Sequence, residues 1–568
     1  MLHKIMILEK WRKAMDSYVN GTVKTDEKTI SVRCERGKTL LAVLRENGIL
    51  LSAPCGGNGT CGKCRVTVSG AVSAIEAQEA HLLHEEEIEA GIRLACMCRI
   101  SGDFMVSIEK AAMRIETDYR AVPYDLSPMI AKKKEGDMSE FYRDGILVER
   151  VLGDAANLGL AVDIGTTTVA VYLCDMETGT VLATRAFRNP QAAYGADVIS
   201  RIDKIMKDKK ALAEQQRLIS NAVREAGISA CGERGLSFAD VRAAVLCGNT
   251  VMEHIAAGID PSSIANAPFT APTLFGAYYS AAELSFLENE HSILYFAPCF
   301  ASYVGGDIAC GMIAQGLDAC ADNVLYIDIG TNGEIGLSTR NGLYFCSAAA
   351  GPAFEGAHIE CGMSGISGAI DKISLKDGKI VFHSIGSGTP LGICGSGLID
   401  AVAVMLETGL LDETGRIVER DEAGKYAAYI DEDETGASIF LIDKEHSVYL
   451  TGKDIREIQL AKAAICAGIY TLLDKAGLSL SDVSSVVLAG GFGSHIDKAS
   501  ACRIGLIPRE LEDKITAVGN AAGAGAVAIL LGGSPREAAR TICDKSDYTE
   551  LSGDAYFMEK YIEEMMFE

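Results

Sequence analysis

The sequence lacks any run approaching the ~20 consecutive apolar residues that a membrane-spanning helix needs. Its hydrophobic residues, 48% of the total, are interleaved with 59 glycines. Positive charge is also scarce, because 53 lysines and arginines face 77 acidic residues and leave a formal net charge of -24. Binding to nucleic acid or to an anionic membrane requires a basic surface. We therefore expect a soluble protein that binds small molecules or other proteins, with no nucleic acid and no membrane.

We also expect no secretory signal peptide in the first residues. The apolar stretch that such a peptide requires is interrupted by Lys4, Glu9, Lys10, Arg12 and Lys13. The 18 cysteines are scattered singly, apart from one group between Cys55 and Cys98. In a large protein that is not exported, such scatter indicates reduced thiols. We expect a cytoplasmic protein.

A chain of 568 residues is expected to form about two to four domains. Residues 28–110 show a strand, a helix, a cysteine-rich loop and further strands, which is the pattern of a complete small domain. Residues 1–27 precede it as an N-terminal extension. Its apolar spacing suits a short docking helix, but a true start of the chain at Met15 fits the sequence equally well, and we assign the extension no function. Residues 111–157 show little periodicity and are interpreted as a linker or a small intermediary module.

Residues 158–568 alternate strands with amphipathic helices, which predicts an α/β domain. The pattern LGLAVDIGTTTVAVYL near its start is repeated as NVLYIDIGTNGEIGLST about 165 residues later. Two similar halves of this kind predict a duplicated domain with two lobes.

The cysteine group has the spacing of a metal-cluster site. Cys55, Cys61 and Cys64 form C-x5-C-x2-C in a glycine-rich loop, and Cys96 and Cys98 follow. Four thiolates from such a loop and a distant strand are the ligands of a 2Fe-2S cluster, and glycines let the loop turn its N–H groups toward the anionic cluster. A structural zinc site is the alternative, but it usually needs two C-x2-C pairs. On spacing alone, either Cys96 or Cys98 could be the fourth ligand.

Two Asp-x-Gly-Thr segments each follow an apolar stretch that is typical of a buried strand. A carboxylate at a strand end can hold Mg²⁺ through water, and a Gly-Thr turn directs N–H and hydroxyl groups at phosphate oxygens. Because no G-x4-G-K-[ST] loop is present, binding of ATP and Mg²⁺ must depend on these segments. Their candidate residues are Asp163, Gly165, Thr166, Thr167, Thr168, Asp328, Gly330, Thr331, Asn332 and Gly333.

A third segment ends a buried strand in glycines that would let the backbone approach a flat ligand: Gly490, Gly491, Phe492 and Gly493. Alone, it could equally be a tight turn between strand and helix. Asp163 and Asp328 are the candidate catalytic residues. Glu334 is an alternative base, although a solvated hairpin carboxylate is the favoured interpretation. The nine histidines show no paired metal spacing, which favours polar core or surface roles.

The segment APCGGNGTCGKC, followed by RLACMCRI, resembles the ferredoxins of the adrenal and bacterial type, and the implied fold is an α+β β-grasp. In that family the cysteine after Arg-Leu-small is the ligand, which selects Cys96. The three phosphate and glycine segments, in this order, resemble the superfamily of acetate and sugar kinases, heat-shock ATPases and actin. That resemblance implies an α/β, duplicated, two-lobed actin-like ATPase fold. It also implies that Asp163 and Asp328 face each other across the cleft, with one serving Mg²⁺ and the other orienting water.

A 2Fe-2S domain ahead of such an ATPase resembles the reductive activators of corrinoid proteins, over nearly the whole chain from about residue 28. The matching segments include LCGNTVMEH, SAAAGPAFEGAHIECGM, ICGSGLID, TGKDIREIQLAKAAI, LAGGFGSHI and GNAAGAGA. The resemblance implies an enzyme that uses ATP and low-potential electrons to reduce Co(II) of a methyltransferase corrinoid protein to Co(I). It also implies an upstream electron donor and a homodimer, although the segment between ferredoxin and ATPase is shorter than in longer members.

Three other functions remain as hypotheses. They are a small-molecule kinase with a ferredoxin domain, an activator of another low-potential enzyme, and a scaffold of the actin type. The scaffold fits poorly with an electron carrier, and the sequence offers no substrate pocket for the kinase.

Overall fold

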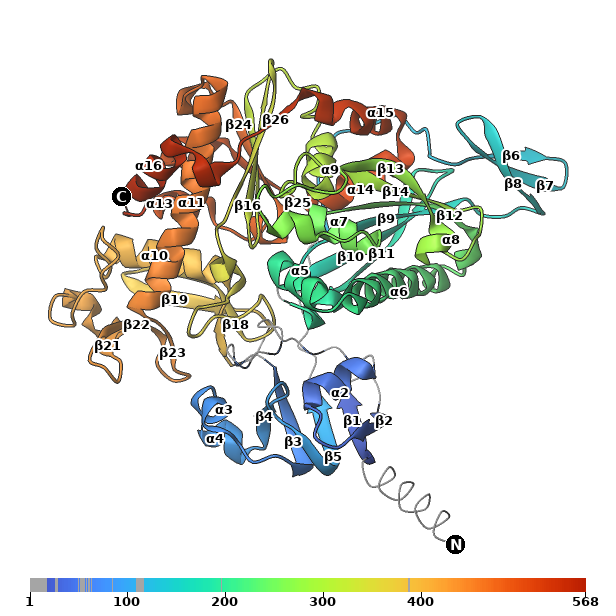
Figure 1. The fold of residues 1–568 in the computed structure, drawn as a ribbon. Helices are drawn as coiled ribbons and strands as arrows, with labels where there is room; N and C mark the ends of the chain where they lie inside the picture. Colours follow the sequence, from blue (N-terminus) through green and yellow to red (C-terminus); the bar gives the residue numbers. More distant parts are fainter. Residues whose placement is uncertain are drawn as a thin grey trace, which may run out of the picture. The chain divides into compact units, whose positions relative to one another are not determined.

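The computed structural model describes residues 18–25, 29–47, 49, 51, 57, 59, 62, 64–83, 85–108, 117–195, 197–386 and 389–567. The helix considered near the N-terminus lies outside these residues. The described residues form two compact units (Figure 1), one within Met1–Ala112 and Arg188–Ala211 and the other within Met113–Phe187 and Leu212–Glu568. No helix in the described part of the chain is long and apolar enough to cross a membrane.

The first unit contains a five-stranded sheet with the strand order β2-β1-β5-β3-β4. Strand β1 pairs in parallel with β5 and antiparallel with β2, and helix α2 contributes Leu40, Val43 and Leu44 to a core shared with Val23 and Val106. This arrangement is the expected β-grasp. Its elements are β1 (Tyr18–Thr25), β2 (Thr29–Glu35), α2 (Leu40–Glu46), β3 (Arg65–Val72), α3 (Ala77–His81), α4 (Glu85–Glu89), β4 (Ile92–Leu94) and β5 (Ile100–Ile108).

The domain starts earlier than the predicted residue 28, because strand β1 belongs to it. Its pairing with both β2 and β5 makes residues 18–25 an integral part of the sheet. Only Val19 and Val23 supply large buried apolar side chains, so the alternation is a weak signal in the sequence. An added Cβ at Gly21 would overlap the Phe104 ring, so the glycine lets that ring cover the strand.

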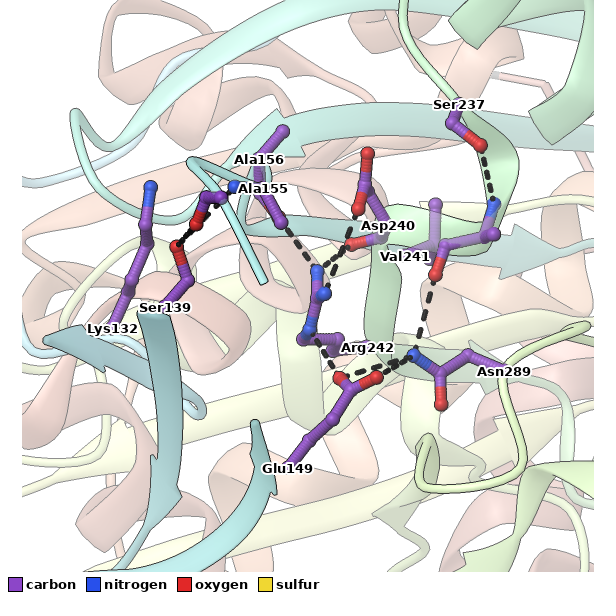
Figure 2. Close-up of polar contacts among 12 residues, drawn as sticks. Lys132, Ser139, Glu149, Ala155, Ala156, Ser237, Asp240, Val241, Arg242 and Asn289 are labelled. Atoms are coloured by element: carbon purple, nitrogen blue, oxygen red, sulfur yellow. Dashed lines mark hydrogen bonds and ion pairs between the residues drawn. The ribbon is translucent and has the colours of Figure 1, made fainter. Parts of the chain in front are cut away.

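The second unit begins with a small antiparallel sheet of β6 (Ala131–Glu135), β7 (Met138–Arg143) and β8 (Ile146–Leu152). Figure 2 shows how a buried arginine anchors it to the large domain. Arg242 donates to Glu149 of β8 at 2.6 Å and to the Ala156 carbonyl oxygen at 2.6 Å. Its guanidinium also lies 3.5 Å from the centre of the Phe141 ring, and Asn289 donates to Glu149 at 3.2 Å. Because the arginine is buried and fully engaged, this sheet is fixed to its neighbour.

Two six-stranded sheets form the lobes, in the orders β11-β10-β9-β12-β14-β13 and β25-β24-β15-β16-β17-β26. The first contains β9 (Leu158–Ile164), β10 (Thr168–Asp175), β11 (Thr180–Arg188), β12 (Val241–Gly248), β13 (Phe275–Ser280) and β14 (Ile293–Pro298). The second contains β15 (Val324–Ile329), β16 (Gly333–Thr339), β17 (Gly342–Ala348), β24 (Ser485–Ala489), β25 (Ile515–Gly519) and β26 (Ser546–Tyr548).

The two sheets share one topology. In each, the first strand forms an antiparallel hairpin with the second and pairs in parallel with a later strand, so β9, β10 and β12 correspond to β15, β16 and β24. The next parallel strands, β14 and β25, correspond as well. This order confirms the duplication that the repeated Asp-x-Gly-Thr pattern predicts.

Helices from both lobes pack against each other beside the first sheet (Figure 1): α9 (Gly306–Ala314) follows β14, and α14 (Ala521–Leu531) follows β25. They meet so closely that an added Cβ at Gly525 would overlap the carbonyl oxygen of Cys310. Other helices include α5 (Val198–Lys207), α6 (Lys210–Glu233), α7 (Thr250–Ala256), α10 (Gly395–Thr408), α11 (Gly452–Ala476), α12 (Gly490–Gly493), α13 (Lys498–Arg503), α15 (Gly533–Thr541) and α16 (Ala555–Glu563).

His254 has the structural role that its sequence context favours. Its Nδ1 lies 2.7 Å from the Thr250 carbonyl oxygen, and its Nε2 accepts from the Thr273 N–H at 3.4 Å. The ring is fully buried and contacts Phe275 edge to face. Burial lowers its pKa, so the neutral ring serves as a hydrogen-bonding part of the core.

Candidate functional site

The first Asp-x-Gly-Thr loop lies at the carboxyl end of β9. Asp163 is the penultimate residue of the strand, the turn follows, and β10 begins at Thr168. An added Cβ at Gly165 would lie 2.7 Å from the Thr168 carbonyl oxygen, so the turn accepts only glycine without moving. The hairpin therefore holds Asp163 and the threonine hydroxyls together at one end of the sheet.

The second loop repeats this geometry in the other lobe. Asp328 is the penultimate residue of β15, and the Gly330 N–H donates to the Asn332 carbonyl oxygen at 2.8 Å to close the turn. Glu334 pairs with Asp328 in the β15–β16 register. Its side chain is half-buried, and burial raises its pKa well above the usual range, so Glu334 is not a fully exposed hairpin carboxylate, and its role as an alternative base stays a prediction.

The third segment contacts the second loop through its glycines. Strand β24 runs parallel to β15 with Ala489 beside Asp328. Gly490 follows with φ +81°, and an added Cβ there would overlap Asp328 Oδ1. Glycine at this turn thus lets the backbone lie close to the Asp328 carboxylate, and the turn also joins β24 to α12.

A matching turn lies beside Asp163 in the first lobe. The register places Cys247 beside Asp163 and Gly248 beside Ile164, and an added Cβ at Gly248 would lie 2.6 Å from the Ile164 carbonyl oxygen. The segment LCGNT is therefore the topological counterpart of LAGGF. Sequence reasoning assigned it no binding role, because only one of its residues at the turn is glycine.

Asp163 also contacts the N-terminus of one of the two central helices. Asn520, the N-cap residue of α14, donates its side-chain amide to Asp163 Oδ2 at 2.9 Å. In the corresponding helix of the other half, α9, the N-cap is Gly305 and Asp307 lies in the first turn. Sequence reasoning missed both, although Asn520 lies in the segment GNAAGAGA and Asp307 follows two glycines at a helix start.

The charges of the two loop aspartates, Asp163 and Asp328, affect the pKa of Asp307. Burial raises the pKa of Asp328 to about 6 and that of Asp163 to about 7. Burial, followed by the charges of Asp328 and Asp163, raises the pKa of Asp307 to about 8. All three side chains remain partly exposed. They are therefore surrounded by protein yet reachable by solvent, with pKa values in the neutral range where proton transfer is most effective.

Glu355 joins the two phosphate loops. Its Oε1 accepts from the Thr331 hydroxyl at 2.6 Å, and its Oε2 accepts from the Thr167 hydroxyl at 3.3 Å. The residue ends a 3₁₀ turn, η4 (Pro352–Glu355), whose Phe354 stacks on Phe492 with ring centres 5.6 Å apart. One turn thus touches all three segments that the sequence singles out for ATP.

The cysteine site is described in part, because Cys55 and Cys61 lie outside the described residues. Cys64 Sγ and Cys96 Sγ lie 3.3 Å apart, close enough to bind the same iron. Three glycines of the loop, Gly57, Gly59 and Gly62, have positive φ, as the wrapping of an anionic cluster requires. The thiol donors and the backbone conformation therefore fit a 2Fe-2S cluster.

Cys98 has different surroundings from Cys96. It is fully buried in the domain core, and burial raises the pKa of its thiol to about 11. A metal-bound cysteine must be a thiolate, which this environment disfavours. Cys96 is partly exposed and faces Cys64.

A buried ion pair supports the turn that carries Cys96. Arg93 donates to Glu79 at 2.9 and 2.7 Å, and the Leu94 N–H donates to Glu79 Oε1 at 2.8 Å. Arg93 also donates to the Ser73 carbonyl oxygen at 2.8 Å. The pair therefore fixes the backbone immediately before Cys96.

These features define a class of protein in which a ferredoxin-type iron-sulfur domain precedes an ATPase of the acetate and sugar kinase, heat-shock and actin type. Family descriptions match both parts. They are a 2Fe-2S iron-sulfur cluster binding domain at residues 23–101, the RACo middle region at 158–320, and the C-terminal domain of RACo, the ASKHA domain, at 322–568.

Individual relatives are more specific. The chain is 34% identical over 417 residues to the corrinoid activation enzyme RamQ of Eubacterium limosum, a match that covers 72% of this chain and 70% of the relative. It is 23% identical over 395 residues to the Co(II) methylated amine-specific corrinoid protein reductase of Methanosarcina barkeri, covering 64% and 68%. A solved reductive activator for corrinoid, iron-sulfur protein has a TM-score of 0.69 at 31% identity, covering 96% of this chain and 98% of its own. The chain belongs to the family of reductive activators of corrinoid proteins, which confirms the resemblance seen in the sequence.

Proposed function

We propose that this chain is an ATP-dependent reductive activator that transfers low-potential electrons to a corrinoid protein of a methyltransferase system and reduces its cobalt from inactive Co(II) to Co(I). One observation carries the proposal. A single chain combines a paired-thiol cluster site with a duplicated aspartate site, and it aligns with corrinoid activators over most of its length. A reduced partner that supplies electrons from upstream is also required.

The ligands of the 2Fe-2S cluster would be Cys55, Cys61, Cys64 and Cys96. The cluster supplies transfer of one electron at a time. The protein holds the last of these thiols through the Glu79–Arg93 pair and keeps Cys98 protonated in the core.

The phosphates of ATP would be bound by the turns that begin at Gly165 and Gly330, and its flat adenosine part by the turn that begins at Gly490, all at the carboxyl ends of parallel strands. Asp163 would hold Mg²⁺ through water. Asp163 is oriented by Asn520, which leaves the Asp307 and Asp328 carboxyls to orient a water molecule and accept its proton, because their pKa values lie near neutrality.

Coupling follows from the placement of this site between lobes. The Glu355 carboxylate accepts from Thr167 in the loop of the first sheet and from Thr331 in the loop of the second. A ligand shifts a conformational equilibrium only by its differential affinity for the two states. ATP that contacts both lobes can favour the arrangement in which the lobes close around it. In this way it can supply free energy for an uphill electron transfer.

The test is to mix the reduced protein with a Co(II) corrinoid protein anaerobically and to follow the Co(I) absorbance before and after Mg-ATP is added. The proposal expects Co(I) only with ATP. A small-molecule kinase would instead transfer the γ-phosphate to a product and leave the cobalt spectrum unchanged with or without ATP.

A further inference from the structure

The hydroxyls of Thr167 and Thr331 come from different lobes and converge on one carboxylate. Thr331 donates to Glu355 Oε1 and Thr167 donates to Glu355 Oε2. A hydroxyl has one proton to donate. Each threonine can therefore donate either to Glu355 or to a phosphate oxygen, but not to both.

The backbone around Glu355 is held on both sides. An added Cβ at Gly356, which has φ +77°, would lie 2.6 Å from the Met363 backbone nitrogen. An added Cβ at Gly395, the first residue of α10, would overlap the Phe354 carbonyl oxygen. Because this close packing leaves little room for the turn to yield, the carboxylate is directed at the two hydroxyls.

We propose that Glu355 is a positioning residue for the ATP-dependent step, whose carboxylate competes with the phosphates of ATP for the Thr167 and Thr331 hydroxyls. The inference rests on the proposed ATP site and adds a partner for its threonines. The carboxylate accepts two hydroxyl hydrogen bonds, as a phosphate oxygen pair would, and its negative charge repels the incoming phosphates.

Displacement of Glu355 has a structural consequence. The bond from Thr167 to Glu355 ties the first lobe to the second, and the same turn stacks Phe354 on Phe492. When phosphates take over the hydroxyls, this bond between the two lobes is lost, while the turn itself stays in its packed position.

The experiment measures the equilibrium dissociation constant of Mg-ATP for the full-length holoprotein and for Glu355→Gln. Glutamine keeps the size of the side chain and removes its charge, so affinity should rise about three- to tenfold. Glu360→Gln makes the same charge change at an exposed position of the same segment and should stay within about twofold of the wild type. Structural damage would weaken binding, so a gain separates competition from misfolding.

A double-mutant cycle with Thr331→Val tests the shared hydroxyl. In that background there is no Thr331 hydroxyl to release, so the gain from Glu355→Gln should shrink to the part that the Thr167 bond and the charge of the carboxylate supply. Unchanged or weaker binding by Glu355→Gln would overturn the inference, and so would a gain that persists in full beside Thr331→Val. Because no corrinoid protein is present, these results are independent of whether the chain reduces cobalt.

Discussion

Asn520 and Asp163 are joined by a hydrogen bond of 2.9 Å that runs from the N-cap of α14 to the end of β9. The amide hydrogen bond favours the ionised form of Asp163 and opposes the effect of burial on its pKa. The same asparagine caps its own helix by accepting from the Gly523 N–H at 2.7 Å. A residue that follows the second sheet therefore controls the charge of the carboxylate in the first.

Replacing Asn520 by serine should separate these two roles. Serine retains a side-chain oxygen for the helix cap but has no amide to reach Asp163. We expect the pKa of Asp163 to rise and Mg-ATP binding to weaken about three- to tenfold near neutral pH. Equilibrium binding at several pH values checks this, because the loss should diminish at alkaline pH. An equal loss at every pH would assign the effect to the helix.

Mg-ATP binding should strengthen as the pH rises from about 6 to about 8.5, since the ionised forms of Asp328, Asp163 and Asp307 bind Mg²⁺ and its waters. Binding should release protons, which calorimetry in buffers of different ionisation enthalpy measures. In the protein without ATP, the same raised pKa values make the free energy of unfolding fall as the pH rises. The stability that the three carboxyls contribute is fully present below the unfolded pKa of about 3.9 and is lost as the pH rises through the folded values. Proton uptake on binding would contradict this assignment.

Cys96→Ala should bleach the protein and lower its iron content below about two per chain, whereas Cys98→Ala should keep the colour. The reason is that Cys96 faces Cys64, and Cys98 is a protonated thiol in the core. Visible absorbance and iron analysis of the two purified variants decide the matter. Retention of iron by Cys96→Ala together with its loss from Cys98→Ala would reverse the ligand assignment.

Breaking the buried pair with Glu79→Gln should destabilise the iron-sulfur domain by about 3–5 kcal/mol, because it leaves the Arg93 charge buried without a partner. The control is Glu46→Gln, which breaks the exposed Lys38–Glu46 pair and should have an effect of about 0–1 kcal/mol. Thermal bleaching of the cluster absorbance reports both. Equal midpoints for the two variants would mean that the pair does not hold the Cys96 turn.

Much of the fold follows from local sequence. The glycines and threonines after Asp163 and Asp328 predict two hairpins, and the repetition of the pattern predicts two lobes. Strand β1 was missed because its inward residues, Val19 and Val23, are too few to produce a strong alternation. A weak strand is fixed by its pairing partners, which are distant in sequence.

The candidate site was predicted in part for a similar reason. Motifs reveal residues on one strand and its turn, such as Asp328 and Thr331. Asn520, Asp307 and Glu355 reach the same place from helices and a turn far along the chain, and only packing brings them there. Asn520 and Glu355 did lie in segments that resemble the activator family, but the resemblance gave them no role.

The measurement that decides whether ATP and the cluster act together is Co(I) formation by Asp328→Asn. Asparagine keeps the shape of the side chain but lacks the charge that Mg-ATP requires, and the cluster lies in a separate unit. The variant should retain the cluster spectrum and accept an electron from dithionite, yet form no Co(I) from a Co(II) corrinoid protein when Mg-ATP is added, while the wild type does. Co(I) formation by the variant at the wild-type rate would show that the iron-sulfur domain transfers electrons without ATP coupling.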